Sequence, residues 1–162
     1  LPELPVFELS SQDIADGQPL PQAQVAGQDV SPQLSWSGAP EGTKTYAVTC
    51  FDPDAPTASG FWHWAAFNIP ADVTELPTGA GAKDGLGVGA VVLAGDSGVK
   101  GYYGANPPAG DGPHRYLDTI FDDDYCAAHG LLGSVADHPV EIADPAVEIS
   151  GWARCTTAVR PR

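Results

Sequence analysis

Short apolar segments separated by prolines and glycines run along the chain, and apolar positions spaced as on a helix are scarce. The segment 45–51 is β-branched and aromatic and has the length of a strand. Similar patterns predict strands at 31–36, 62–69, 88–94, 115–121 and 147–152. A helical turn or two is predicted only at 72–76 and 127–135. Strands joined by Gly/Pro turns predict a mostly β chain folded as an antiparallel sandwich.

The first forty residues are rich in Pro, Gln, Ser and Gly and contain short apolar pieces such as 5–9. This pattern predicts irregular or edge β structure wrapped on a core. The whole chain of 162 residues, 43% hydrophobic and 17% charged, is typical of one globular domain spanning 1–162. Because no segment approaches ~18 consecutive apolar residues, we expect no transmembrane segment. The opening residues also lack the basic region and apolar core of a signal peptide.

Charge and cysteine content narrow the partners and the compartment. The chain has 21 acidic and 7 basic residues, a net charge of −14. Nucleic acid needs a clustered basic surface, and an anionic membrane would repel this chain, so neither is an expected partner. Cys50, Cys126 and Cys155 show no C-x-x-C spacing, which argues against a disulfide framework or a zinc cluster. A buried free thiol at Cys50 favours a reducing compartment, and we expect the cytoplasm.

Two aspartates directly follow the clearest predicted strand. In the segment Asp52-Pro53-Asp54-Ala55-Pro56, two prolines fix φ and remove two backbone donors. An ordinary Asx-Pro turn is one interpretation of this segment. Carboxylates do not bind an anion directly. We therefore expect Asp52 and Asp54 to hydrogen-bond a histidine ring, favour its charged form and fix which nitrogen faces a ligand.

A histidine lies between two tryptophans, Trp62-His63-Trp64, in the next predicted strand. Strict alternation would place both tryptophans on one face and His63 on the other. A core histidine satisfied by a backbone carbonyl is one interpretation. The other is functional, because a strand that returns beside 45–51 would bring His63 close to Asp52.

A second histidine motif, His114-Arg115-Tyr116, follows the Gly/Pro-rich loop 102–113, which contains two tyrosines and the pair Pro107-Pro108. Such a loop is a suitable rim for a ligand site. On the predicted strand, His114 and Tyr116 share one face and can offer a ring N–H and a phenol to one ligand. Arg115 takes the other face, where we expect it to brace the aspartate loop as a buried ion pair.

Other chemistries have weaker support in the spacing. Two histidines and two aspartates could hold a divalent metal, but no H-x-H or H-x-x-x-H spacing is present. A serine hydrolase needs an activated serine, and no G-x-S-x-G elbow is present. Acid–base catalysis by His63 with Asp52, in a small hydrolase, stays open. The residues favour a non-enzymatic site for a small anionic group, without a cofactor or a metal.

Together these motifs resemble the phosphatidylethanolamine-binding protein family, which includes the Raf kinase inhibitor proteins, and within it the bacterial and archaeal branch. The resemblance rests on the two-aspartate loop, Trp62-His63-Trp64, Pro107-Pro108 and Gly112-Pro113-His114-Arg115-Tyr116. Two further stretches, 29–38 and 67–77, match in context. The resemblance covers about residues 5 to 121, and residues 122–162 depart from the family pattern, in which an amphipathic helix precedes a last strand.

The resemblance implies a large central antiparallel sheet packed against a smaller one, with few short helices. It also implies a small pocket for phosphate, carboxylate, phosphoethanolamine or a similar phospholipid head group. The implied ligand-binding residues are Asp52, Asp54, His63, Pro108, His114 and Tyr116, with Arg115 as a structural brace. Some family members inhibit kinases or serine proteases, so a protease- or kinase-inhibitory interaction module is the alternative function.

Overall fold

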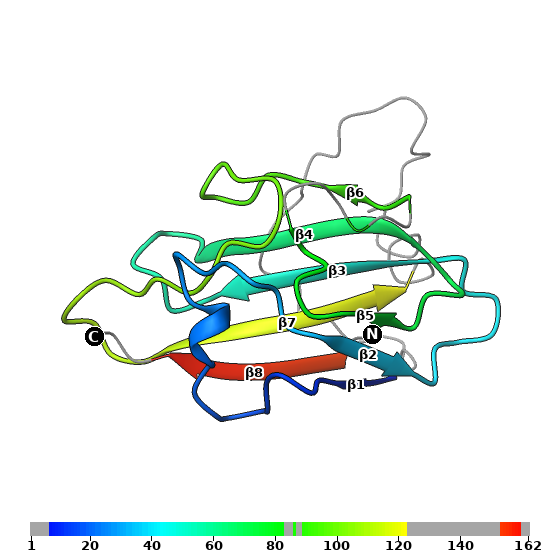
Figure 1. Ribbon diagram of the computed structural model, residues 1–162, viewed down its shortest axis with the longest axis horizontal. Helices are drawn as coiled ribbons and strands as arrows, with labels where there is room; N and C mark the ends of the chain where they lie inside the picture. The colour runs from blue at the N-terminus through cyan, green and yellow to red at the C-terminus, as the bar shows by residue number, and fades with distance from the viewer. Residues whose placement is uncertain (1–6, 83–85, 87–88, 123–152, 160–162) are drawn as a thin grey trace.

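The computed structural model describes residues 7–82, 86, 89–122 and, as backbone, 153–159. Two antiparallel sheets form this part of the chain (Figure 1). The small sheet contains β1 (Glu8–Ser10), β2 (Leu34–Ser37) and β5 (Glu75–Leu76), in the order β1-β2-β5. The large sheet contains β3 (Thr45–Asp52), β4 (Phe61–Pro70), β6 (Val91–Val92), β7 (His114–Asp122) and β8 (Ala153–Val159), in the order β6-β4-β3-β7-β8. The predicted mostly β class with a larger and a smaller antiparallel sheet is confirmed.

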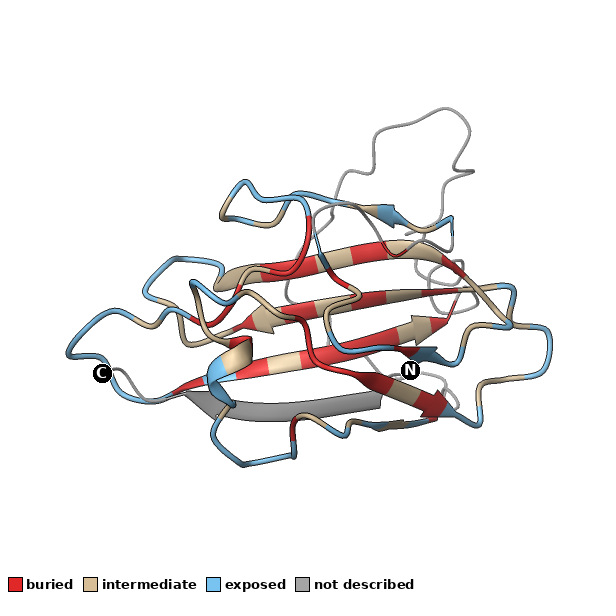
Figure 2. Ribbon diagram, viewed as in Figure 1, coloured by how far each residue is buried: buried red, intermediate tan, exposed pale blue. Residues whose placement is uncertain are grey.

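The core lies between the two sheets. Along β3, buried and half-buried residues alternate strictly, as Figure 2 shows by its red and tan bands. The buried side of β3 faces the small sheet, where the Trp36 ring of β2 packs edge-on against Tyr46 with centroids 5.3 Å apart. Phe7 contacts the same tyrosine at 6.2 Å. Burial of these aromatic rings helps to hold one sheet on the other.

The three long strands were predicted to within one residue at each end. The predicted segment 31–36 overlaps β2, and 88–94 contains the short strand β6. The helical turn predicted at 72–76 is wrong, because Glu75 and Leu76 pair with β2 and bury Leu76 against the core. Tertiary pairing here overrides a weak local pattern. The helical turn predicted at 127–135 and the strand predicted at 147–152 lie outside the described residues.

Helix is nearly absent from the described part of the chain. A single turn of 3-10 helix, η1 (Gln22–Gln24), was not predicted. No helix among the described residues is long and apolar enough to cross a membrane.

The ends of three neighbouring strands lie side by side at one end of the large sheet, on the left of Figure 1. β3 ends there, whereas β4 and β7 begin there, because both pair with β3 in antiparallel fashion. Asp52 therefore lies opposite Phe61, and Phe51 lies opposite Leu117. The two-aspartate loop and the two histidine motifs all lie at this end of the sheet.

Candidate functional site

A buried hydrogen bond joins the end of β3 to the start of β7. His114 Nδ1 lies 2.8 Å from Asp52 Oδ2, and both residues are almost fully buried. Because a carboxylate only accepts, Nδ1 carries the proton and Nε2 remains for other contacts. The second carboxylate oxygen of Asp52 accepts the backbone N–H of Asp54 at 2.8 Å. Asp52 thus fixes the ring of His114, and not that of His63 as the sequence predicts.

Asp54 binds Arg115 at the surface. Its two oxygens accept from Nη2 and Nε of Arg115, each at 2.8 Å, and one of them also accepts the backbone N–H of Arg115. These hydrogen bonds lower the pKa of Asp54 to about 2. The Arg115 side chain is 57% exposed, so the expectation of a buried ion pair is wrong. Arg115 lies on the outer face of β7, where alternation puts it next to solvent.

A β-bulge turns His63 toward the core. Cys50 pairs with Trp64 and Phe51 pairs with Trp62, so His63 is an additional residue on β4. The Trp62 ring packs on Phe51 of the outer face at 4.5 Å, whereas His63 and Trp64 are both buried. The expectation that the two tryptophans share one face is therefore wrong. The bulge interrupts the alternation and re-aims the imidazole.

The buried ring of His63 is held by the loop that precedes β7. Its Nδ1 lies 2.8 Å from the backbone oxygen of Tyr103, and the Tyr103 ring stacks on it with centroids 5.8 Å apart. Because a carbonyl oxygen only accepts, Nδ1 carries the proton. Burial lowers the pKa of His63 below its ordinary value, so the ring is neutral at neutral pH. Its Nε2 is then an acceptor, and the expectation of a charged form does not hold for this ring.

Tyr116 brings a phenol to the ring of His63. Its ring meets the edge of His63 with centroids 5.0 Å apart, and it is 1% exposed. Within the described residues, its hydroxyl has no hydrogen-bond partner. Burial first, and then the negative charge of Asp52, raise the pKa of Tyr116, so the phenol stays protonated. A protonated hydroxyl beside the His63 imidazole can donate to a ligand.

Close backbone contacts hold the loop before β7 in place. A Cβ at Gly104 would lie 2.4 Å from the backbone carbon of Val25, so only glycine fits there. The Gly104 N–H donates to Asp29 Oδ1 at 2.8 Å. Further along, the carbonyl of exposed Pro108 accepts the N–H of Asp111 at 3.2 Å, which closes a turn before β7. None of the contacts described for His63, His114 and Tyr116 involves Pro108.

The candidate site consists of His63, His114, Tyr116 and Asp52, and two contributors to it, Tyr103 and Asp111, were not predicted. The backbone oxygen of Tyr103 orients His63, and no side-chain pattern could show this. Asp111 has a detectable signal, because it is a carboxylate three residues before His114. Its Oδ2 lies 3.5 Å from His114 Nε2. Among the described residues, no three His, Cys, Asp or Glu side chains form a possible metal site.

The sequence is similar to that of known proteins of one family. The family model described as phosphatidylethanolamine-binding protein matches residues 10–147, so the similarity extends beyond residue 121. YbcL of Escherichia coli K12 is 51% identical over 123 residues, which cover 71% of this chain and 67% of YbcL. YbhB of the same organism is 45% identical over 121 residues, which cover 70% of this chain and 76% of YbhB.

The fold agrees with this assignment. The crystal structure of E. coli YbcL, described as a new member of the mammalian PEBP family, superposes with a TM-score of 0.78 and 36% identity. The superposition covers 98% of this chain and 100% of that one. The Chlamydia trachomatis PEBP homologue CT736 shares the fold with a TM-score of 0.71 and 24% identity, over 97% and 99% of the two chains. By its sequence and by its two-sheet fold, the chain belongs to the phosphatidylethanolamine-binding protein family.

Proposed function

We propose that the protein binds a small anionic group (phosphate, a phosphorylated head group or a carboxylate) at His63, His114 and Tyr116, and catalyses no reaction there. The observation that carries this proposal is the buried hydroxyl of Tyr116, which has no hydrogen-bond partner in the part of the chain that the structure describes. A buried hydroxyl without a hydrogen bond costs roughly 1–3 kcal/mol. A ligand oxygen that accepts from this hydroxyl recovers that cost.

The two histidines support the same ligand class. Each has its Nδ1 engaged by an internal oxygen, of Asp52 for His114 and of Tyr103 for His63. This leaves Nε2 of His63 for a ligand, and Nε2 of His114 lies 3.5 Å from the half-exposed carboxylate of Asp111, longer than an ordinary hydrogen bond. Asp52 and Asp54 act indirectly, because their carboxylates are engaged by protein donors. Membership of a family described as phosphatidylethanolamine-binding agrees with a binding role.

The sequence also suggests two other functions, a small hydrolase and an inhibitory interaction module, and they have different support. A hydrolase based on His63 and Asp52 loses its residue pair, because Asp52 hydrogen-bonds His114 instead. Inhibition of a kinase or a protease stays a prediction from the family resemblance. Binding of a small anionic group is therefore the function that the described contacts support best.

Anion binding is expected to be coupled to proton uptake by His63. Burial lowers the pKa of His63 in the free protein below its ordinary value of 6.5. A bound anion favours the charged ring and raises that pKa again. The ligand complex then holds more protons than the free protein, so affinity for phosphate increases as pH falls toward the pKa of the free ring.

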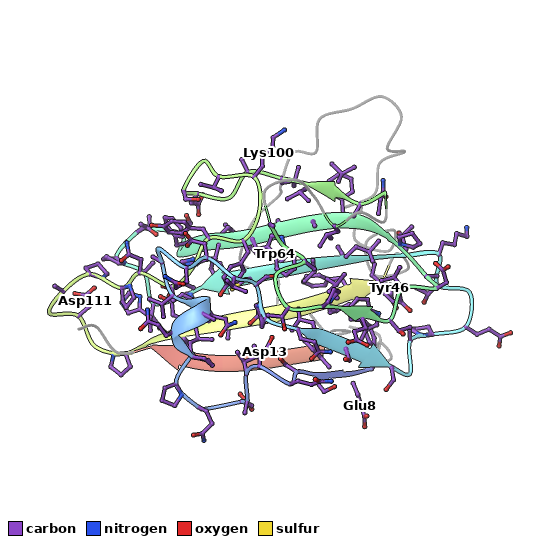
Figure 3. All side chains as sticks on the ribbon, viewed as in Figure 1. Glu8, Asp13, Tyr46, Trp64, Lys100 and Asp111 are labelled. Carbon is purple, nitrogen blue, oxygen red and sulfur yellow. The ribbon has the colours of Figure 1, made fainter. Side chains whose placement is uncertain are left out.

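The test is calorimetric titration with inorganic phosphate at about pH 6 and about pH 8. We expect Tyr116→Phe to weaken binding about fivefold, the loss of roughly one hydrogen bond. His114→Ala should weaken it by roughly 1–3 kcal/mol, as for a charge-assisted hydrogen bond. Tyr46→Phe, at the opposite end of β3 (Figure 3), is the matched control and should bind like wild type.

Tyr116→Phe is the decisive variant because it removes a single oxygen for which the described residues provide no hydrogen-bond partner. His114→Ala also leaves the buried carboxylate of Asp52 without its partner. Unchanged phosphate affinity in Tyr116→Phe would show that phosphate does not bind at this site. Saturable phosphate binding that is stronger at the lower pH, and weakened in Tyr116→Phe alone of the two tyrosine variants, supports it.

A further inference from the structure

One peptide group links His63 to a carboxylate outside the candidate site. The carbonyl of the peptide group between Tyr103 and Gly104 accepts from Nδ1 of His63 at 2.8 Å. The N–H of the same peptide group donates to Asp29 Oδ1, also at 2.8 Å. A further hydrogen bond, from the N–H of Tyr103 to the carbonyl of His63 at 3.0 Å, ties this loop to β4. The ring of His63 is therefore connected to the Asp29 carboxylate through a single rigid peptide plane.

Asp29 lies in a tight turn that holds its side chain against this peptide group. Its backbone N–H donates to the carbonyl of Val25 at 3.2 Å, and its φ of 53° lies in the left-handed region. Glycine, asparagine and aspartate tolerate this conformation better than other residues. Asp29 Oδ2 accepts the N–H of Gly27 at 3.2 Å, while Oδ1 accepts that of Gly104. The turn and the two hydrogen bonds fix the direction of the carboxylate.

This connection bears on where the neutral ring of His63 carries its proton. Hydrogen bonds in a chain strengthen one another, so an N–H that donates to a carboxylate makes the carbonyl of its own peptide group a stronger acceptor. A stronger acceptor keeps the proton of His63 on Nδ1 and leaves Nε2 without one. Because an unprotonated Nε2 cannot donate to an anion, the ring must first take up a proton there.

Other titratable groups lie close to the ring and act on its charge. They are Asp52 of β3, Asp96 of the turn after β6, Tyr103 of the loop before β7 and Tyr116 of β7. Burial lowers the pKa of His63, whereas the hydrogen bond to the loop and the two negative charges raise it. In the described part of the chain, Asp29 is the carboxylate linked to the peptide group that holds Nδ1.

We propose that Asp29 is a positioning residue of the anion site: through the peptide group between Tyr103 and Gly104, it holds the neutral ring of His63 in the tautomer with its proton on Nδ1. The inference rests on the proposed function and adds a residue to it. A bound anion charges the ring and strengthens the hydrogen bond from Nδ1 to the carbonyl. The polarised peptide group then strengthens the hydrogen bond from Gly104 to Asp29. Occupation of the site is thus coupled to a hydrogen bond outside it.

The first experiment determines the tautomer of His63 without ligand, from long-range ¹H–¹⁵N correlation spectra at about pH 8. Asp29→Gly removes the carboxylate, and glycine adopts the left-handed φ of this position without strain. We expect a mixture of both tautomers in this variant. Asp29→Asn keeps an oxygen that can accept the N–H of Gly104, so it should restore the Nδ1–H tautomer.

The pH profile of phosphate binding separates this role from a merely structural one. At about pH 6, Asp29→Gly should bind phosphate roughly fivefold more weakly than wild type, because the charged ring loses about one well-placed hydrogen bond. At about pH 8 its affinity should change little, because the Nε2–H tautomer can donate without proton uptake. Asp29→Asn should follow the wild-type profile.

Asp96→Asn is the matched control for loss of a nearby charge. Asp96 Oδ2 also accepts a backbone N–H beside His63, that of Trp62 at 2.8 Å. Its negative charge acts on the ring, but its hydrogen bond does not involve the peptide group that holds Nδ1. This variant should therefore keep the Nδ1–H tautomer of wild type.

A second experiment needs no variant, and decides the matter if Asp29→Gly does not fold. During a phosphate titration of wild type, the amide proton of Gly104 should shift downfield with the same midpoint as Nε2 of His63. The amide of Gln33 is the control, because it donates to Asp13 Oδ2 at 2.7 Å, in a contact that does not involve the candidate site. It should not shift.

Three results would overturn the inference. In the first, Asp29→Gly keeps the Nδ1–H tautomer. In the second, Asp96→Asn loses that tautomer as fully as Asp29→Gly does. In the third, the Gly104 amide does not move although phosphate shifts Nε2 of His63, so the anion site stands and the role of Asp29 falls. If phosphate shifts neither resonance, the proposed function fails, and the ligand-free tautomers still decide whether Asp29 holds the ring.

Discussion

Asp118→Asn is expected to become more stable relative to wild type as pH rises. The difference between their free energies of unfolding should grow by roughly 4 kcal/mol between about pH 4 and about pH 8. Asp118 lies on the core face of β7, directly opposite Cys50. One of its carboxylate oxygens has no hydrogen-bond partner among the described residues. Burial raises the pKa of Asp118 from its ordinary value of 3.8 to about 7.

The sign follows from proton binding. Between pH 4 and pH 7 the folded protein keeps the Asp118 proton, whereas the unfolded chain has released it. The free energy of unfolding therefore falls as pH rises through this window and levels off above the folded-state pKa. Asparagine has no proton to lose at this position, so Asp118→Asn lacks this decline.

Urea unfolding of both proteins across this pH range measures the effect. His63 contributes a trend of opposite sign, because its lowered pKa makes stability rise with pH up to its ordinary value. The difference between wild type and variant removes that contribution. Asp54→Asn is the control: the pKa of Asp54 is about 2 in the folded protein and its ordinary value is 3.8, so both states are largely ionised above about pH 4 and the difference from wild type should change little over this range. A difference between wild type and Asp118→Asn that is equally constant would contradict the buried-carboxyl assignment.

Asp52→Ala is expected to destabilise the fold by about 3–5 kcal/mol, the cost of removing one partner of a buried pair. The substitution leaves Nδ1 of His114 without its acceptor and the N–H of Asp54 without its cap. Both losses occur where the end of β3 meets the start of β7. The midpoint of urea unfolding reports the change.

Asp54→Ala provides the contrast two residues away. Asp54 also pairs with a basic side chain, but that side chain is 57% exposed. Exposed ion pairs contribute at most about 1 kcal/mol, so Asp54→Ala should lower stability far less than Asp52→Ala. Equal losses in the two variants would mean that the aspartate loop acts as one structural unit, and that the Asp52–His114 bond has no special weight.

The sequence predicted the long strands well because their apolar positions alternate. Along β3, every second side chain is buried, and this pattern is visible in the sequence itself. The same alternation failed at His63, where a bulge adds one residue to β4. The residues of the segment Trp62-His63-Trp64 give no sequence signal for that bulge. The paired partners also depend on register: Asp52 reaches His114 across 62 positions of sequence.

Local patterns were weakest where tertiary contacts decide. The segment 72–76 has some helical spacing, yet its last two residues extend the small sheet. The carbonyl that holds His63 belongs to a loop whose path depends on Gly104 lying against Val25. The motifs therefore named the residues of the candidate site, but their hydrogen-bond partners emerged only from the fold.

We propose that one small anion is shared by the Nε2 atoms of His63 and His114 and the hydroxyl of Tyr116. Long-range ¹H–¹⁵N correlation spectra of the histidine rings, recorded during a phosphate titration, test this arrangement. We expect saturable shifts of both Nε2 resonances with a common midpoint, confined to His63 and His114, with the Nδ1 protons retained. Unchanged Nε2 resonances at millimolar phosphate, or a shift in only one of the two rings, would contradict it.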